Sequence, residues 1–294
     1  MSGWPAADEA RELRRRAEGA AECLRLALGR RAWRGPAGHW LGTGAGSSIE
    51  FHDHRPFLPG DDPRYLDWAA YARSGQLLAK MFREDVSPRV DLVLDASPSM
   101  LFDAAKRART LELFYFVVES VRAARAALAC HVLAGDSVVA PSLDGLLAGA
   151  WETSLGAPRG TAAPPLAKVP WRPGSLRVWI SDLLFPGDPV PLLAALTARR
   201  GHALVLAPYC RAEAEPDWSG NHDFRDCESG ARRWLRIDGE RLRRYRDAYA
   251  RHFTLWQTAG VRQAVLCCRV DSAGTLEAAL GREALRAGAV EPWS

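Results

Sequence analysis

Lysine is almost missing from this 294-residue chain, because only Lys80, Lys106 and Lys168 among its 39 basic side chains are lysines. An excess of one charge sign is missing too, since 35 acidic residues leave a net charge of only +4. A surface that binds nucleic acid normally carries a concentrated basic patch. We therefore expect no nucleic-acid partner, and we give the preference for arginine no functional weight.

The sequence also lacks cysteine pairs, an export signal and long hydrophobic runs. Its six cysteines include no C-x-x-C pair, the spacing typical of metal and redox sites. The first 16 residues are polar and charged, whereas a signal peptide has an apolar centre. The longest mostly apolar run, residues 111–118, is far shorter than the roughly 20 residues of a membrane-spanning helix. We expect a cytoplasmic protein with no transmembrane segment.

The N-terminal third predicts one helix followed by a small strand-rich region. Hydrophobic residues make up 48% of the chain, which is enough for a large core. Residues 6–28 carry apolar side chains at spacings of three and four, which predicts a helix. A glycine-rich stretch follows at residues 35–46, and short strands and turns are expected from there to about Arg83. We assign residues 1–88 to an N-terminal helix and a small subdomain.

Strands and helices alternate after Arg89, which is typical of a parallel sheet with crossover helices. We therefore assign residues 89–294 to an α/β domain with a mostly parallel sheet and helices on both faces. Besides the strand that ends at Asp95, the predicted strands are 129–133, 175–181, 202–207 and 261–270, and the predicted helices are 104–128 and 239–257.

An apolar strand at residues 90–94 leads directly into Asp95, which is followed at alternate positions by Ser97 and Ser99. These side chains offer oxygen donors and no sulfur or imidazole, a set that suits Mg²⁺ or Mn²⁺. A structural alternative is a strand-to-helix turn in which Ser99 or Asp103 caps the next helix. These residues alone leave both interpretations open.

Two further segments favour the cation site. The apolar run at residues 176–180 leads to Asp182, so Asp182 is expected at the same carboxyl edge of the sheet as Asp95. Thr161 follows Gly160 in a predicted loop between these strands and is a candidate third hydroxyl. Ligands of open α/β sheets bind along this edge, in the crevice where the strand order reverses.

This set of five residues resembles the metal-ion-dependent adhesion site of von Willebrand factor A domains: Asp95, Ser97, Ser99, Thr161 and Asp182. The resemblance implies a von Willebrand A-like fold in which these side chains hold Mg²⁺ or Mn²⁺, directly or through water. It also implies an open position on the ion that an acidic side chain of a partner protein completes. The implied function is protein binding, with no catalytic residue and no organic cofactor.

The segment ahead of this site resembles the signature of the bacterial domain-of-unknown-function family fifty-eight, and the resemblance extends over about residues 50–280. Proteins of this family often accompany MoxR-type AAA+ ATPases, so the resemblance implies such an ATPase as the leading partner. The charged residues of this segment could pair with one another or contact a partner, and the sequence leaves both roles open. The matching residues are Glu50, Phe51, Arg55, Pro59, Gly60, Asp61, Asp62, Arg64, Asp67, Trp68, Ala72, Arg73 and Glu84, with Asp226-Cys227-Glu228-Ser229-Gly230 similar to the closing part.

An enzyme is the main alternative, because haloacid-dehalogenase-like phosphatases keep an aspartate nucleophile at the end of the first strand of an α/β sheet. Asp95 would then serve a Mg²⁺-dependent phosphatase-like hydrolase. Those enzymes carry the motif Asp-x-Asp at this point. Here Ser97 stands in place of the second aspartate, and a serine cannot act as the general acid that protonates the leaving group. A zinc site at His52-Asp53-His54 is also disfavoured, because the other histidines show no ligand spacing. We expect a binding protein rather than an enzyme.

Overall fold

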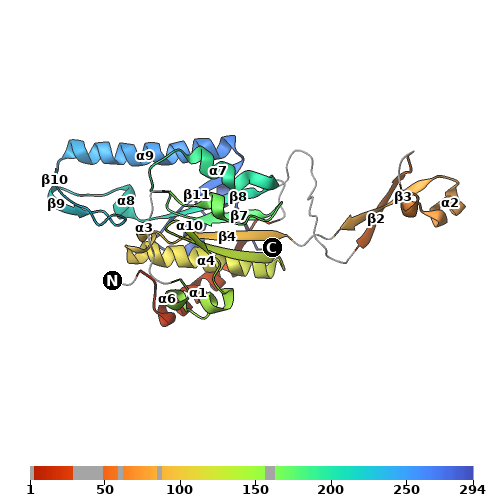
Figure 1. Ribbon diagram of the computed structural model, residues 1–294, viewed down its shortest axis with the longest axis horizontal. Coiled ribbons are helices and arrows are strands. Elements are labelled where there is room, and N and C mark those ends of the chain that lie inside the picture. The colour runs from red at the N-terminus through yellow and green to blue at the C-terminus, as the bar shows by residue number, and fades with distance from the viewer. Residues whose placement is uncertain (1–2, 29–48, 59–61, 85–87, 156–162, 294) are drawn as a thin grey trace. The chain divides into compact units, whose positions relative to one another are not determined.

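The computed structural model describes residues 3–28, 49–58, 62–84, 88–155 and 163–293 (Figure 1). The chain divides into two compact units, one formed by Trp40–Ser87 and the other by Met1–His39 together with Pro88–Ser294. The larger unit is built around a six-stranded sheet with helices on both faces. The predicted α/β fold with a mostly parallel sheet is confirmed.

The sheet of the larger unit is parallel except at one edge. Its strand order is β11-β8-β7-β4-β5-β6, and the edge strand β6 (Ser137–Val139) runs antiparallel to β5. Parallel neighbours need crossover connections, and these connections supply the covering helices. The five parallel strands are β4 (Arg89–Asp95), β5 (Ala127–Ala134), β7 (Leu176–Ile180), β8 (His202–Tyr209) and β11 (Val265–Asp271).

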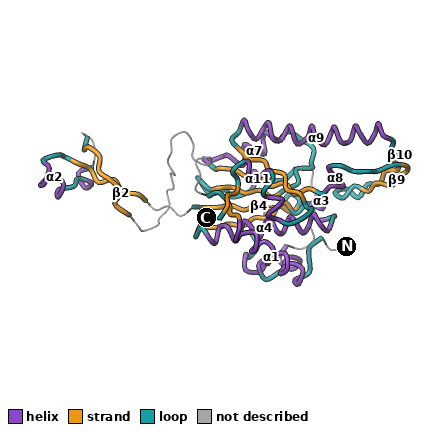
Figure 2. Tube along the Cα trace, turned by 180° about the vertical axis from the view of Figure 1, so that it is seen from behind, coloured by secondary structure: helices purple, strands orange, loops and turns teal. Residues whose placement is uncertain are grey.

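Both faces of the sheet are covered, which explains why its strands are mostly apolar. The covering helices are α1 (Ala7–Cys23) and α4 (Ala104–Ala123) on one face, and α7 (Pro189–Thr197) and α9 (Gly239–Arg262) on the other (Figures 1 and 2). Leu92 and Leu94 of β4 belong to the core under α1 and α4. Val93 belongs to the core under α7 and α9. Alternate residues of a strand point to opposite faces, so β4 is buried from both sides.

The N-terminal helix α1 belongs to the larger unit. Its residues Leu13 and Ala17 are buried in the core that α4 shares. The short strand β1 (Leu24–Leu26) that follows pairs with β12 (Val290–Pro292) near the other end of the chain. The predicted division at residue 88 groups this helix with the strand-rich region, whereas its apolar face packs in the core of the α/β unit.

Several predicted element boundaries were wrong. The helix predicted at 6–28 ends at Cys23, and the helix predicted at 104–128 ends at Ala123. Both predictions ran into a following strand whose apolar residues continue the helical spacing. Arg125 makes the turn between α4 and β5 with a φ of 51°, a left-handed conformation that an arginine does not signal. At the other end of the sheet, α9 continues to Arg262, so β11 begins later than the predicted residue 261.

The smaller unit is a hairpin with two short helical turns between its strands. Its strand β2 (Ile49–Pro56) pairs antiparallel with β3 (Leu78–Glu84), and the connection contains η2 (Pro63–Tyr65) and α2 (Trp68–Ser74). The Asp67 side chain caps α2 by accepting hydrogen bonds from the backbone N–H groups of Ala69 and Ala70, at 2.9 and 3.0 Å. An aspartate cap satisfies the first orphan donors of a helix.

Some of the charged and polar side chains of this unit contact one another. His54 Nε2 lies 2.6 Å from Asp67 Oδ2, and Arg64 pairs with Asp62 at 2.6 Å. These contacts favour pairing within the unit as the role of these members. Other predicted members lie outside the described residues or have side chains that are not described: Glu50, Phe51, Arg55, Pro59, Gly60, Asp61 and Glu84, as well as His52 and Asp53 of the zinc alternative.

A second hairpin, β9 (Gly220–Arg225) and β10 (Arg232–Ile237), lies near the start of α9 (Figures 1 and 2). Aromatic contacts join it to α9, because the Trp218 ring lies 5.0 Å from that of Phe224 and 5.3 Å from that of Tyr245. The remaining elements are α3 (Pro98–Leu101), α5 (Leu143–Leu147), α6 (Trp151–Leu155), η3 (Leu166–Lys168), η4 (Ala198–Arg200), α8 (Arg211–Ala214), α10 (Leu276–Leu280) and α11 (Glu283–Arg286). Within the described ranges, none of the helices has both the length and the apolar character needed to cross a membrane.

Candidate cation-binding site

The carboxyl ends of β4 and β7 lie where the strand order of the sheet reverses. The chain runs from β4 outward to β5 and β6, then returns to the other side of β4 to form β7. Asp95 is the last residue of β4, and Asp182 comes two residues after the end of β7. Because the two strands pair in parallel, both aspartates emerge at the same edge. Open α/β sheets bind their ligands at such a switch point.

The turn after β4 brings three oxygen-bearing side chains to one place. Asp95 Oδ1 accepts a hydrogen bond from the Ser97 backbone N–H at 3.0 Å, which fixes the turn. The hydroxyl oxygens of Ser97 and Ser99 lie 3.0 Å apart. Asp95 and Ser99 are 5% and 7% exposed. All three residues line the same cavity.

The helix-capping alternative accounts for Asp103 but not for the serines. Asp103 caps α4 by accepting a hydrogen bond from the Lys106 backbone N–H at 2.8 Å. Ser97 stands at the N-cap position of α3, yet its hydroxyl makes no capping hydrogen bond there. It contacts the Ser99 hydroxyl instead. The two hydroxyls are therefore available to a ligand in the cavity.

A buried lysine that the sequence did not single out holds Asp182. Lys106 Nζ donates to Asp182 Oδ2 at 2.7 Å and to Glu213 Oε1 of α8 at 2.5 Å. The other Asp182 oxygen accepts a hydrogen bond from the Leu184 backbone N–H at 2.9 Å. Burial lowers the pKa of Lys106, but the charges of Asp182 and Glu213 outweigh burial and hold that pKa above its ordinary value. Lys106 therefore stays charged, and its charge is committed to these two carboxylates.

Asp95 has no such basic partner within the described part of the chain. Burial raises the pKa of Asp95 to about 6, and repulsion from Asp182 adds to the rise. Hydrogen bonds oppose the rise, one from the Ser181 hydroxyl to Asp95 Oδ2 at 2.7 Å and others from Ser97. A cation next to Asp95 would favour its ionised form.

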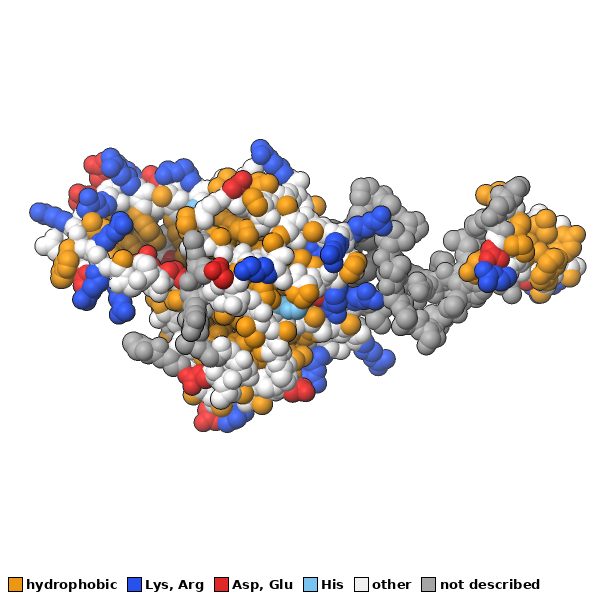
Figure 3. Space-filling model, in the orientation of Figure 1, with side chains coloured by type: hydrophobic (Ala, Val, Ile, Leu, Met, Phe, Trp, Pro, Cys, Tyr) orange, Lys and Arg blue, Asp and Glu red, His pale blue; other side chains and the backbone are white. Residues whose placement is uncertain are grey.

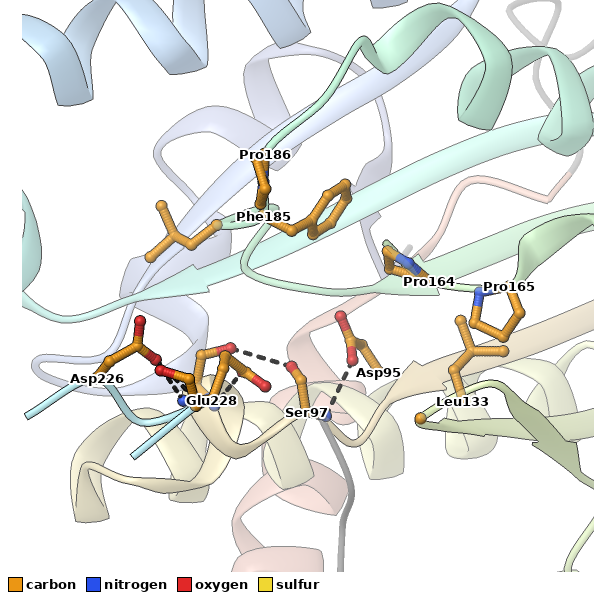
Figure 4. A pocket seen from close by; sticks show the side chains of 13 residues that line it. Asp95, Ser97, Leu133, Pro164, Pro165, Phe185, Pro186, Asp226 and Glu228 are labelled. Atoms are coloured by element: carbon orange, nitrogen blue, oxygen red, sulfur yellow. Dashed lines mark hydrogen bonds between the residues drawn. The ribbon is translucent and has the colours of Figure 1, made fainter. Parts of the chain in front are cut away.

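A cavity of about 410 Å³ opens at this edge of the sheet. Figure 4 shows Asp95, Ser97, Asp226 and Glu228 along one side of it and Phe185 on the other. The described lining residues include three carboxylates and no lysine, arginine or histidine. Carboxylate and hydroxyl oxygens are ligands that Mg²⁺ and Mn²⁺ prefer. The side chains present at this edge therefore fit a hard divalent cation.

The predicted third hydroxyl, Thr161, lies outside the described residues. Pro164 and Pro165, which follow it in the chain, line the cavity. Of the other predicted site residues, Asp95, Ser97 and Ser99 line the cavity directly. Asp182 lies at the same edge, but its carboxylate is turned to Lys106 and does not contribute to the lining.

Residues 53–144 match the family described as "Protein of unknown function DUF58". This match covers the first part of the span predicted from the sequence. No curated protein matches the chain.

Two solved structures are similar to part of this chain. The conserved hypothetical protein BatB from Bacteroides thetaiotaomicron is 19% identical, with a TM-score of 0.38 over 68% of this chain and 98% of that one. An aerotolerance-related membrane protein from Bacteroides fragilis NCTC 9343, solved with multiple mutations to serines, is 19% identical, with a TM-score of 0.40 over 68% of this chain and all of that one.

The prediction of site residues missed Glu228, which reaches the cavity from the turn between β9 and β10. Its Oε1 accepts a hydrogen bond from the Ser99 backbone N–H at 3.0 Å, across 129 positions in the sequence. No local spacing marks such a distant contact. The available signal was the similarity of residues 226–230 to the closing part of the family, which pointed to the segment and not to the role of its glutamate.

A second cavity adjoins the first. It has a volume of about 720 Å³ and shares Ser99 and Glu228 with the first cavity. Its walls include Trp218, Phe224 and Leu235, so it is more apolar than the first. The arrangement therefore offers an oxygen-lined position beside a space that can accept an apolar side chain.

Proposed function

We propose that this protein is a cation-dependent protein-binding module rather than an enzyme. Asp95, Ser97 and Ser99 hold one Mg²⁺ or Mn²⁺ in a von Willebrand A-like arrangement, and an acidic side chain of a partner completes the shell. The observation that carries the proposal is the cavity at the end of β4, whose described lining offers carboxylate and hydroxyl oxygens and no basic side chain. Such an oxygen set with an exchangeable position suits these ions.

Each residue has a distinct part in this proposal. Asp95 supplies a negative charge directly to the ion, and Ser97 and Ser99 supply neutral oxygens. Asp182 acts through its charge, because its carboxylate is turned to Lys106 and does not line the cavity. Thr161 is proposed as a further hydroxyl ligand.

The surface near the cavity supports an acidic partner. Figure 3 shows basic side chains gathered at the end of the larger unit that carries β9, β10 and the start of α9. Arg225 and Arg233 of this hairpin are exposed and line the second cavity. Basic groups around a binding site attract an acidic partner and speed its association. The family resemblance makes a MoxR-type AAA+ ATPase the first partner to test.

Thermal unfolding with and without Mg²⁺ or Mn²⁺ tests the cation site. A ligand that binds the folded state raises the melting temperature. We expect this rise in the wild type and in Asp144→Ala, which removes an exposed carboxylate of α5. We expect no rise in Asp95→Ala. An equal rise in all three proteins would remove the proposed site.

Purification of the protein with its partners from native cells tests the binding role. We expect a protein partner that is retained by the wild type in Mg²⁺, and lost both in EDTA and in the Asp95→Ala variant. A partner retained equally under all three conditions would show that binding does not pass through the cation.

A further inference from the structure

Glu228 enters the cavity with one carboxylate oxygen satisfied and the other not. Its Oε1 accepts the Ser99 N–H at 3.0 Å. Its Oε2 is buried, and no hydrogen-bond partner for it exists among the described residues. A buried carboxylate oxygen without a donor is unfavourable, because it has lost its hydration and gained nothing in exchange. An ion bound in the cavity is one of the groups that can compensate such an atom.

The unsatisfied oxygen belongs to a residue that lies beside the proposed cation ligands. Ser99, which donates its N–H to Glu228, also has its hydroxyl 3.0 Å from that of Ser97. Figure 4 shows Glu228, Ser97 and Asp95 one after another along the same wall. The buried Lys106 ammonium group does not pair with either carboxylate, because it is paired with Asp182 and Glu213. The carboxylates of Asp95 and Glu228 therefore face one cavity without a basic side chain in its described lining.

A closed turn holds Glu228 in this place. Asp226 Oδ1 accepts hydrogen bonds from the backbone N–H groups of Glu228 and Ser229, at 2.8 and 3.0 Å. The Asp226 N–H donates to the Ala231 carbonyl at 2.8 Å and closes the hairpin. Gly230 takes a φ of +71° within the turn, a conformation that glycine adopts without strain. The chain thus presents the glutamate from a fixed hairpin rather than from an extended tail.

We infer that Glu228 is an in-chain ligand of the cation and that it occupies the coordination position a partner's carboxylate must take. This inference rests on the proposed function and adds that Glu228 competes with the partner's carboxylate for the ion. Partner binding exchanges one carboxylate for another, so the charge around the ion stays the same. Glu228 and Ser229 line both cavities, so displacement of the Glu228 side chain opens the oxygen-lined cavity toward the apolar one.

Titration with Mn²⁺ alone tests whether Glu228 is a ligand. The matched variants are Glu228→Gln and Glu215→Gln, because Glu215 is 72% exposed at the end of α8. We expect Glu228→Gln to weaken Mn²⁺ binding by roughly tenfold or more, and to add one exchangeable water to the bound ion, counted by water-proton relaxation. Glu215→Gln should equal the wild type in both measurements.

Acetate tests the competition, because it is the smallest probe that carries a carboxylate. On the Mn²⁺-loaded proteins, we expect Glu228→Gln to bind acetate more tightly than the wild type and Glu215→Gln do. Equal acetate affinity in all three proteins would overturn the competitor role. If Glu228→Gln does not fold, Glu228→Asp gives the same comparisons, because it keeps the charge and withdraws the carboxylate by one methylene.

The outcomes separate this inference from the proposed function. A wild type that binds no Mn²⁺ would overturn both. A wild type that binds Mn²⁺, with binding lost in Asp95→Ala but unchanged in Glu228→Gln, would leave the cation site standing and overturn the role of Glu228.

Discussion

Lys106 Nζ lies 2.7 Å from Asp182 Oδ2 in a fully buried ion pair at the carboxyl edge of the sheet. This pair distinguishes two aspartates that look alike in the sequence, since Asp95 has no such partner among the described residues. A buried charge is tolerated when it is paired, which explains the position of Asp182. Asp95 is left as a carboxylate that a bound cation can compensate.

The Lys106 ion pair predicts a large effect of its removal. We expect Lys106→Met to lower the free energy of unfolding by about 3–5 kcal/mol, because it leaves the buried carboxylate of Asp182 and the partly buried carboxylate of Glu213 without the lysine charge. Urea unfolding measures the loss. Lys168→Met is the control, since Lys168 donates to a backbone carbonyl at an exposed position. A loss as small as that of the control would contradict this role of Lys106.

The raised pKa of Asp95 predicts that this residue lowers the free energy of unfolding at high pH. Its pKa of about 6 in the folded protein lies above the ordinary 3.8, so folding favours the protonated form. The stabilising contribution is full below about pH 4 and is lost as pH rises through 6. Above that pH, the ionised group costs on the order of 2–3 kcal/mol.

Asp95→Asn removes this cost while keeping the side-chain shape. We therefore expect this variant to have a higher free energy of unfolding in urea than the wild type at pH 8 in EDTA, and nearly the same value at pH 4. Saturating Mg²⁺ should reduce the advantage, because only the wild type gains from the ion. A variant that is less stable than the wild type at pH 8 in EDTA would contradict the account of Asp95.

The fold was largely predictable because its signals are local. Buried parallel strands have mostly apolar sequences. The apolar runs before Asp95 and Asp182 therefore predicted both the sheet and the edge of the sheet that carries the site. The helix ends were not predictable in the same way. Arg125 turns the chain with a positive φ, and no glycine or proline marks the end of α4.

The partners of the site residues were not predictable, because they depend on contacts between distant segments. Lys106 reads as an ordinary charged residue of a helix, and only the packing of α4 shows that it is buried beside Asp182. Glu228 meets Ser99 only because the β9–β10 hairpin returns to this edge. Periodicity and spacing contain no information about either contact.

A second buried network on β4 provides a test of stability apart from cation binding. Asp91 accepts hydrogen bonds from Arg172 Nε at 2.5 Å and from the Ser175 hydroxyl at 2.7 Å. We expect Asp91→Ala to lower the free energy of unfolding by about 3 kcal/mol and to keep the rise in melting temperature with Mg²⁺. Loss of that rise would show that the two ends of β4 are not independent.

The enzyme alternative predicts turnover that the binding module does not. With para-nitrophenyl phosphate and Mg²⁺, we expect no hydrolysis above the buffer rate, because Ser97 at the second position of the motif cannot protonate a leaving group. Hydrolysis that is abolished by Asp95→Asn would instead identify Asp95 as a nucleophile and would contradict the binding role.

The central claim is that one divalent cation binds at the end of β4. Anomalous diffraction from crystals grown with Mn²⁺ locates such an ion without assumptions about its ligands. The account predicts one peak in the cavity, within direct coordination distance of oxygens of Asp95, Ser97 and Ser99. An empty cavity at saturating Mn²⁺, or a peak elsewhere in the larger unit, would contradict it.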